Sequence, residues 1–160
     1  MTDTPSEDSD TRDSGASDAR RLLADGGSRD GLVTTVSDAS VDDSVDRVKA
    51  AIEEKEALGL IAEIDHEANA ASVERDLRPT TVLVFGNPDL GTPLMEGSRS
   101  LAIDLPQKLL VMEADDGTVT VMYNDPAYLA DRHGIEGEDD RLETVSDALS
   151  SLAAVAAGDE

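Results

Sequence analysis

The spacing of apolar residues along the chain predicts five strands. Each is a short run rich in β-branched and aliphatic side chains, bounded by turn-forming residues. The five runs are residues 32–36, 60–64, 80–85, 108–113 and 118–123. The last two flank Asp116-Gly117, and Asp-Gly is a strong signal for a hairpin turn, so we expect these two strands to pair.

Between the strands, apolar residues recur at helical spacing. Residues 41–52 carry one apolar stripe behind an N-cap at Ser40, and Gly59 supplies a left-handed stop for this helix. A short helical segment over residues 65–71 is predicted from the capping residue Asp65.

Two later helices are predicted where a capping residue precedes a proline. Thr92 precedes one such proline, and the helix that it starts extends to about Ser100. Asp125 precedes the other, and that helix ends near His133. A last helix carries an apolar face over residues 142–155.

This order of elements predicts the fold class. Written βαβ(α)βαββαα, it indicates an α+β protein, a compact two-layer sandwich with about five strands in one main sheet covered by helices. Residues 1–30 are acidic and poor in bulky apolar groups, which predicts a disordered tail. We expect the domain itself over residues 31–136, followed over residues 137–160 by an acidic linker and a C-terminal helix that packs on the domain.

Charge and composition exclude several classes of function. The chain has 36 acidic and 13 basic residues, a formal charge of −23, and three aromatic residues. Such a chain lacks a basic groove or a base-stacking platform, and an anionic membrane repels it, so we expect neither nucleic acid nor membrane as a partner. The absence of cysteine excludes disulfides and thiolate metal sites. Without a spanning or secretory segment, the expected location is the cytoplasm.

The acidity itself has two interpretations. The acids are spread along the chain and only three lysines are present, a pattern typical of proteins that work at high salt, where self-repulsion is screened within about 3 Å at 1 M. The alternative is an acidic surface for a partner protein. The even spread of the acids favours salt adaptation.

Several stretches of the chain form a recognisable set of motifs. The longest is the stretch from Leu77 to Pro88, continued by residues 91–95; the others lie at residues 64–70, 102–106 and 123–135. Together they resemble the motifs of the family known as domain of unknown function 302, DUF302, and the chain resembles a halophilic-type member over roughly residues 31–136. The resemblance implies a compact α+β fold and a homodimer, and it implies no assigned activity. The chain departs from the family pattern at Gln107, where an apolar residue is common.

The two histidines are the first candidates for chemistry. If the fold brings His66 and His133 together, their imidazoles with Asp65, Glu67 or Asp104 could hold a divalent metal. The structural alternatives are a helix-terminal His133 stabilised by the helix dipole and a His66 hydrogen-bonded to its neighbour. Apart from such a divalent metal, the residues identify no particular cofactor.

Polar residues at the ends of elements are candidates for ligand binding. Asn87 and Thr92 lie between a strand and a helix, where backbone N–H groups could receive an anion; a strand-to-helix turn with its cap is the favoured explanation. Tyr123, Asn124 and Tyr128 could line a pocket or merely pack.

Asp104 lies among apolar neighbours and therefore needs a partner. Lys108, Arg78 and Arg99 are the candidates for an ion pair, and acid–base catalysis is the functional alternative.

Three hypotheses follow from these residues. The first is a homodimeric domain that binds a small ligand or a metal. The second is an enzyme that uses His66 or His133 with Asp104 as an acid–base pair. The third is a protein–protein interaction module. No serine stands in a Gly-x-Ser-x-Gly turn, so the sequence gives no support for a serine hydrolase.

Overall fold

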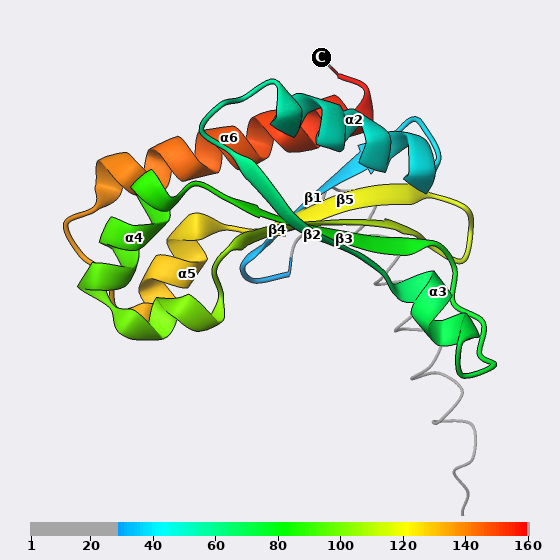
Figure 1. Ribbon diagram of the computed structural model, residues 1–160, viewed down its shortest axis with the longest axis horizontal. Coiled ribbons are helices and arrows are strands. Elements are labelled where there is room, and N and C mark those ends of the chain that lie inside the picture. Colours follow the sequence, from blue (N-terminus) through cyan, green and yellow to red (C-terminus); the bar gives the residue numbers. More distant parts are fainter. Residues whose placement is uncertain (1–28, 160) are drawn as a thin grey trace, which may run out of the picture.

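The computed structural model describes residues 29–159 and contains one five-stranded antiparallel sheet (Figure 1). Its strands are β1 (Leu32–Ser37), β2 (Gly59–Asp65), β3 (Thr80–Gly86), β4 (Gln107–Glu113) and β5 (Val119–Asn124). Their spatial order is β1-β5-β4-β3-β2, and every neighbouring pair is antiparallel. The predicted hairpin is β4–β5, in which Leu109 pairs with Tyr123.

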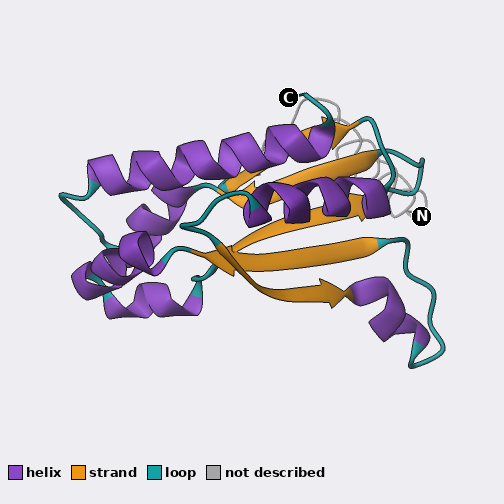
Figure 2. Cartoon of the chain, turned by 45° about the horizontal axis from the view of Figure 1, so that its top comes forward, coloured by secondary structure: helices purple, strands orange, loops and turns teal. Residues whose placement is uncertain are grey.

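Two helices cover one face of this sheet. They are α2 (Val41–Glu53) and α6 (Asp139–Ala157), which lie side by side (Figure 2). At one end of the sheet gather α4 (Pro88–Gly97), the 3₁₀ helix η1 (Arg99–Ile103) and α5 (Pro126–His133). The short α3 (His66–Ala71) lies at the opposite end. The predicted two-layer α+β sandwich and its element order are therefore confirmed.

The core between the two layers is almost entirely aliphatic. The stripe on α2 is buried as its spacing predicts, with Val48 fully inaccessible. It faces Leu83, Leu109 and other inward residues of the sheet, and Leu149 of α6, on the same face of the sheet, belongs to the same core. Because helix and strand periodicities both point these side chains inward, burial of their apolar surface, at about 25 cal/mol per Å², is the main force holding the layers together.

Two predicted helix boundaries are wrong. Helix α2 ends at Glu53, and Gly59 begins β2 in an extended conformation instead of stopping the helix. Helix α4 begins at Pro88, and Thr92 is its fifth residue. The reason is that Asn87 supplies the same cap-and-proline signal directly after β3: its side chain accepts a hydrogen bond from the N–H of Asp89 at 3.0 Å.

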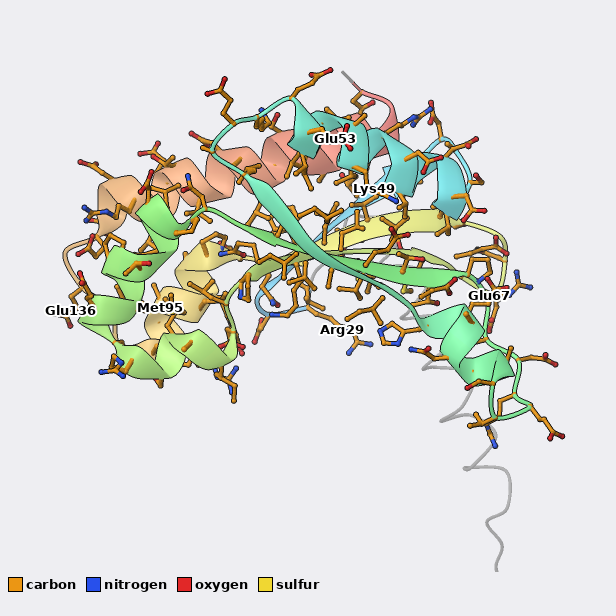
Figure 3. The ribbon with its side chains drawn as sticks, viewed as in Figure 1. Arg29, Lys49, Glu53, Glu67, Met95 and Glu136 are labelled. Atoms are coloured by element: carbon orange, nitrogen blue, oxygen red, sulfur yellow. The ribbon has the colours of Figure 1, made fainter. Side chains whose placement is uncertain are left out.

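Most acidic side chains of the described residues lie on the outside of the molecule. Glu53, Glu67 and Glu136 project from three different segments (Figure 3), and all three are exposed. Of the tail expected over residues 1–30, only Arg29 and Asp30 fall among the described residues. Over residues 29–159, none of the helices combines the length and apolar character that a membrane crossing requires.

Candidate functional site

A largely apolar cleft of about 600 Å³ opens at the end of the sheet where α4 lies. Its walls come from the loop after α2, the start of β2, the junction of β3 with α4, and α6. The lining includes Leu58, Ile61, Leu90, Met95, Leu105 and Leu149. Volumes of 300–1,000 Å³ with apolar walls and a few polar groups are typical of small-molecule sites.

Asn87 and Thr92, two of the predicted ligand-binding residues, line this cleft. The Oδ1 atom of Asn87 is already occupied by the N–H of Asp89, which leaves its NH₂ group as a donor. Gly91 lies between them, and a Cβ added there would stand 3.6 Å from Leu105, an ordinary contact. The wall is thus closely packed around Gly91 without being strained.

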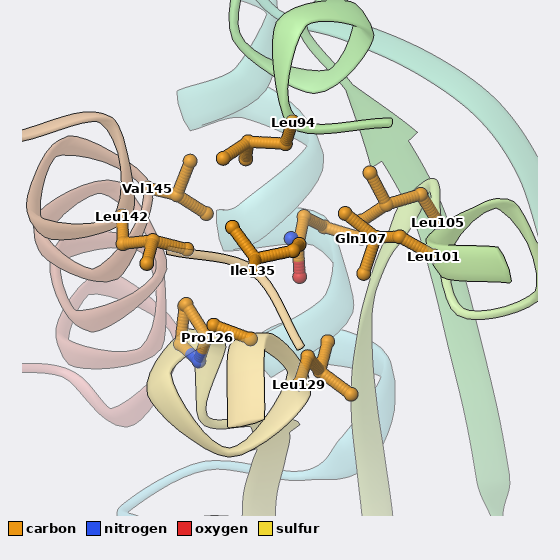
Figure 4. A pocket seen from close by; sticks show the side chains of 10 residues that line it. Leu94, Leu101, Leu105, Gln107, Pro126, Leu129, Ile135, Leu142 and Val145 are labelled. Atoms are coloured by element: carbon orange, nitrogen blue, oxygen red, sulfur yellow. The ribbon is translucent and has the colours of Figure 1, made fainter. Parts of the chain in front are cut away.

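Gln107 is a polar residue of the cleft that the functional predictions missed. It begins β4 and lines both the large cleft and an adjoining cavity of about 10 Å³. Figure 4 shows its amide among Leu101, Leu105 and Ile135. No hydrogen bond of this side chain is found within residues 29–159. The signal for it was the departure from the family pattern, a glutamine where an apolar residue is common.

A second constellation lies where α5 packs against η1. The Nε2 atom of His133 lies 2.6 Å from Oδ2 of Asp104, and its Nδ1 atom lies 2.7 Å from Oγ of Ser100. The His133 side chain is 6 % exposed and that of Asp104 is 17 % exposed, whereas Ser100 is exposed. Two of the predicted catalytic candidates are therefore in direct contact, and Ser100 joins them unpredicted.

The ion-pair partner expected for Asp104 is corrected by the structure. Lys108 donates to the backbone oxygens of Asp104 and Pro106, both at 3.0 Å, and leaves the carboxylate to other groups. Arg132 donates from one nitrogen to both carboxylate oxygens, at 3.0 and 3.2 Å. Arg78 instead contacts Glu113. The helical spacing of 104 and 108 was misleading because a turn and a strand begin between them.

The proton positions in this constellation follow from the charge states of His133 and Asp104. A neutral imidazole has one N–H donor and one acceptor nitrogen. When His133 is neutral and Asp104 is ionised and therefore only accepts, Nε2 of His133 carries the proton and Nδ1 accepts the hydroxyl proton of Ser100. Ser100 therefore donates to a base that a carboxylate orients from behind.

The remaining predicted ligand-binding residues lie away from the cleft. Tyr123 is buried in the core, where loss of solvent raises the pKa of its phenol above 10.0, with Asp125 acting in the same direction and Ser150 opposing it. Asn124 pairs with Leu32 at the end of the sheet. Tyr128 covers Gly31, whose missing Cβ would stand 2.5 Å from the tyrosine ring. Tyr123 and Tyr128 thus have packing contacts, and a ligand-binding role for the three residues stays a prediction.

The two histidines do not share a site. His66 begins α3 and His133 ends α5, at opposite ends of the sheet (Figure 1). Asp65 caps α3 by accepting from the N–H of Ala68 at 3.0 Å. Across residues 29–159, no group of three or more His, Asp or Glu side chains is arranged to hold a metal ion. The hypothesis of a metal held by both histidines fails on this separation.

The five-stranded antiparallel sheet, its single helical layer and the end cluster of α4, η1 and α5 define a two-layer α+β domain. Residues 33–154 match the family model described as "Domain of unknown function DUF302". The chain belongs to the DUF302 family, and the match includes most of α6.

A solved relative shares this fold. It is the crystal structure of an uncharacterized conserved DUF302 protein from Bacillus stearothermophilus, with a TM-score of 0.70 and 15 % sequence identity. The similarity covers 80 % of this chain and 99 % of that one. At this identity, the comparison establishes the fold alone.

Curated relatives are similar over part of their length. The chain is 36 % identical over 130 residues to proteins named fluoride-specific ion channel, FluC 1 of Brucella suis biovar 1 and FluC 2 of Brucella melitensis biotype 1. The matches cover 81 % of this chain, and 51 % and 48 % of those proteins. The chain thus spans about half the length of the curated relatives it matches.

Proposed function

We propose that this protein binds a small, uncharged, largely apolar molecule in the cleft between α4, α6 and the start of β2. The observation that carries the proposal is the cleft itself, about 600 Å³ of mostly apolar wall with polar groups at a few points. Such a wall favours a ligand through the removal of apolar surface from water.

The polar groups limit the chemistry of the ligand. Asn87 offers its NH₂ group, Thr92 a hydroxyl, and Gln107 both a donor and an acceptor. Among the described residues, the lining has one ionisable side chain, the acidic Glu56. An anion would meet this carboxylate with no cation in the lining to balance it, so carbonyl, hydroxyl or ether oxygens are the fitting polar features.

The binding experiment uses the uncharged fluorophore N-phenyl-1-naphthylamine with the full chain in molar KCl. Wild-type protein is expected to enhance its fluorescence saturably. Gly91→Leu places a bulky side chain in the cleft and is expected to weaken binding at least tenfold. Gly97→Leu lies on the same helix, where an added Cβ meets nothing within 4 Å, and is expected to bind as wild type does. Equal binding by both variants would contradict the proposal.

The proposal includes a homodimer in the cytoplasm. By the strand register, the sheet face opposite α2 and α6 carries Val36, Leu110, Met122 and Ile64, and of these Val36 is 46 % and Ile64 37 % exposed. A second copy would remove this apolar surface from water. Sedimentation velocity in molar KCl tests it: Val36→Lys should shift a wild-type dimer to monomer, and a monomeric wild type would contradict it.

We infer a second function, acid–base catalysis, from the 2.6 Å contact between His133 and Asp104. A buried imidazole oriented by a carboxylate is suited to moving a proton. Hydrolysis of p-nitrophenyl acetate tests this function, because a base can activate either water or a hydroxyl group. We expect His133→Gln to lower the rate at least tenfold relative to wild type; an unchanged rate would contradict acid–base catalysis here.

A further inference from the structure

We propose that Ser100 is a nucleophile that takes acyl groups from esters, with His133 as its base and Asp104 as the residue that orients the base. This inference rests on the acid–base function of His133 and deepens it. It is independent of ligand binding in the apolar cleft, since none of the three residues lines that cleft.

The argument begins with the two ring nitrogens of His133. Nε2 faces Asp104 at 2.6 Å, so Nδ1 is the nitrogen that can receive a proton from a reacting group. At 2.7 Å from Nδ1 stands Oγ of Ser100. A nucleophile within hydrogen-bond reach of a base, with the base oriented by a third group, is the arrangement that activates a hydroxyl group.

Accessibility agrees with this role. His133 and Asp104 are held between η1 and α5 with little exposure, while Ser100 is exposed and open to a substrate. A contact that served only to tie η1 to α5 would not need an exposed hydroxyl group. The elements themselves are fixed by the core, because Leu101 of η1 and Leu129 of α5 are both buried in it.

An apolar contact for the acyl group lies beside the hydroxyl. Ile103 is 74 % exposed, the largest exposure among the large apolar residues of the described chain. It follows Ser100 by three residues in η1, and side chains three apart in a 3₁₀ helix lie on the same side. The site is therefore suited to esters of short, apolar carboxylic acids.

The reaction is balanced by the groups present and water. Oγ of Ser100 attacks the ester carbonyl carbon as its proton passes to Nδ1 of His133. The ester C–O bond then breaks, the alcohol leaves with that proton, and an acyl-serine remains. Water attacks the acyl carbon, gives a proton to Nδ1, and Oγ leaves and recovers the proton, which releases the carboxylic acid.

Arg132 is a fourth residue that contacts the group formed by Ser100, His133 and Asp104. Its guanidinium contacts the same carboxylate that supports the imidazole, and so competes with the imidazolium that forms when Ser100 attacks. Because Arg132 is 55 % exposed, solvent screens this competition. Arg132→Gln should therefore change the rate by less than Asp104→Asn.

The test treats the full chain in molar KCl with a fluorophosphonate probe and locates the adduct by peptide mass spectrometry. Wild-type protein is expected to carry one adduct, on Ser100, and to show a burst of one equivalent of p-nitrophenol from p-nitrophenyl acetate. Ser100→Ala should lose both signals. Ser98→Ala removes the hydroxyl that is hydrogen-bonded to Oγ of Ser100 at 3.3 Å. Within residues 29–159 this hydroxyl has no hydrogen bond to His133, and the variant should retain both signals.

The base and its orienting residue are tested by the labelling rate. His133→Gln should slow labelling of Ser100 about 100-fold, and Asp104→Asn at least tenfold. Thermal unfolding in parallel identifies any variant that is unfolded. If a variant is unfolded, the position of the adduct on the wild-type protein still shows whether Ser100 is a nucleophile, because a purely structural hydrogen bond does not make a serine react.

The outcomes separate this inference from acid–base catalysis. An adduct on Ser100 that depends on His133 supports both. Ester hydrolysis that depends on His133 but persists in Ser100→Ala, with no adduct on wild-type Ser100, overturns the nucleophile and leaves the acid–base function standing. If neither hydrolysis nor labelling depends on His133, the nucleophile and the acid–base function are both overturned.

Discussion

The hydroxyl groups of Ser37 and Ser44 lie 2.7 Å apart between β1 and α2. Ser44 is fully buried, and Ser37 donates in turn to the backbone oxygen of Ala156 in α6 at 3.1 Å. The N–H of Ala39 donates to Ser37 at 3.1 Å, so all capacity of the Ser37 hydroxyl is used. One small polar pair thus joins a strand and both covering helices.

A double-mutant cycle on this pair should show strong coupling. Ser37→Ala leaves the buried Ser44 hydroxyl without its acceptor and should lower the free energy of unfolding by about 1–3 kcal/mol. Ser44→Ala leaves Ser37 its other partners and should cost about 1 kcal/mol. The double variant should lose less than the sum. Urea unfolding in molar KCl measures all three, and simple additivity would show that the pair does not act as a unit.

Gly31 is expected to be intolerant of alanine. Its φ of +80° already favours glycine, and a Cβ would stand 2.5 Å from the ring of Tyr128. Gly117 has a φ of +91° with nothing near it, which makes it a matched control for backbone strain alone. Gly117→Ala should cost about 1 kcal/mol and Gly31→Ala clearly more. Thermal unfolding compares them; equal losses would mean that Tyr128 moves aside freely.

Alkaline pH should destabilise the fold through Tyr123. Its pKa in the folded state is raised by burial above the 10.0 of the unfolded chain. The unfolded state therefore loses its proton first, so this contribution is complete below about pH 10 and is lost as pH rises through the folded pKa. Tyr123→Phe should flatten the decline in unfolding free energy between about pH 9 and 11.

The pH dependence of unfolding is measured at high salt so that the contribution of Tyr123 is separated from that of Lys49. The pKa of Lys49 is also raised, by its hydrogen bond and charge attraction with Glu63, and acts in the same alkaline direction. This pair is exposed, so about 1 M KCl screens it, whereas the burial of Tyr123 is unaffected. A slope in molar KCl that Tyr123→Phe leaves unchanged would contradict the assignment.

We propose that the acidic surface is an adaptation to high salt. This interpretation predicts that the stability of the protein rises with the concentration of KCl. At a net charge of −23, dilute buffer leaves self-repulsion unscreened. The melting temperature should rise by roughly 4 °C for each kcal/mol of repulsion that salt relieves. Replacing the exposed Glu143 and Asp147 of α6, which lie beyond its first turn, with their amides should raise it in dilute buffer and weaken the salt dependence. A melting temperature independent of KCl would contradict this interpretation.

Replacing Gln107 with leucine should raise the stability of the protein and weaken its binding of polar ligands. Gln107→Leu replaces an amide that lies among leucines with an apolar group of similar size, and should raise the free energy of unfolding by up to about 1 kcal/mol. Among ligands of equal size, those with a carbonyl or hydroxyl group should lose affinity, while purely apolar ones should keep it. Thermal unfolding and competition with the naphthylamine probe measure the two effects. A destabilised variant would mean that the amide has a partner in the fold.

Local signals in the sequence were sufficient for most of the secondary structure. The stripe on residues 41–52 and the Asp-Gly hairpin were correctly predicted, because each depends on neighbours within a few residues. The predicted start of α4 was wrong because two cap-and-proline signals, at Asn87 and Thr92, compete only five residues apart. The helix uses the signal at Asn87, because this residue follows β3 directly.

The sequence by itself determined the order of elements, the aliphatic core and the acidic exterior, because periodicity and composition act locally. Only the tertiary structure decided which polar residues meet. Ser100 and His133 are 33 positions apart, and they meet because η1 and α5 each bury a leucine in the same core. His66, which the sequence made an equal candidate, lies at the other end of the sheet. Contacts between distant segments follow from packing, and hydrophobic spacing within one segment does not encode them.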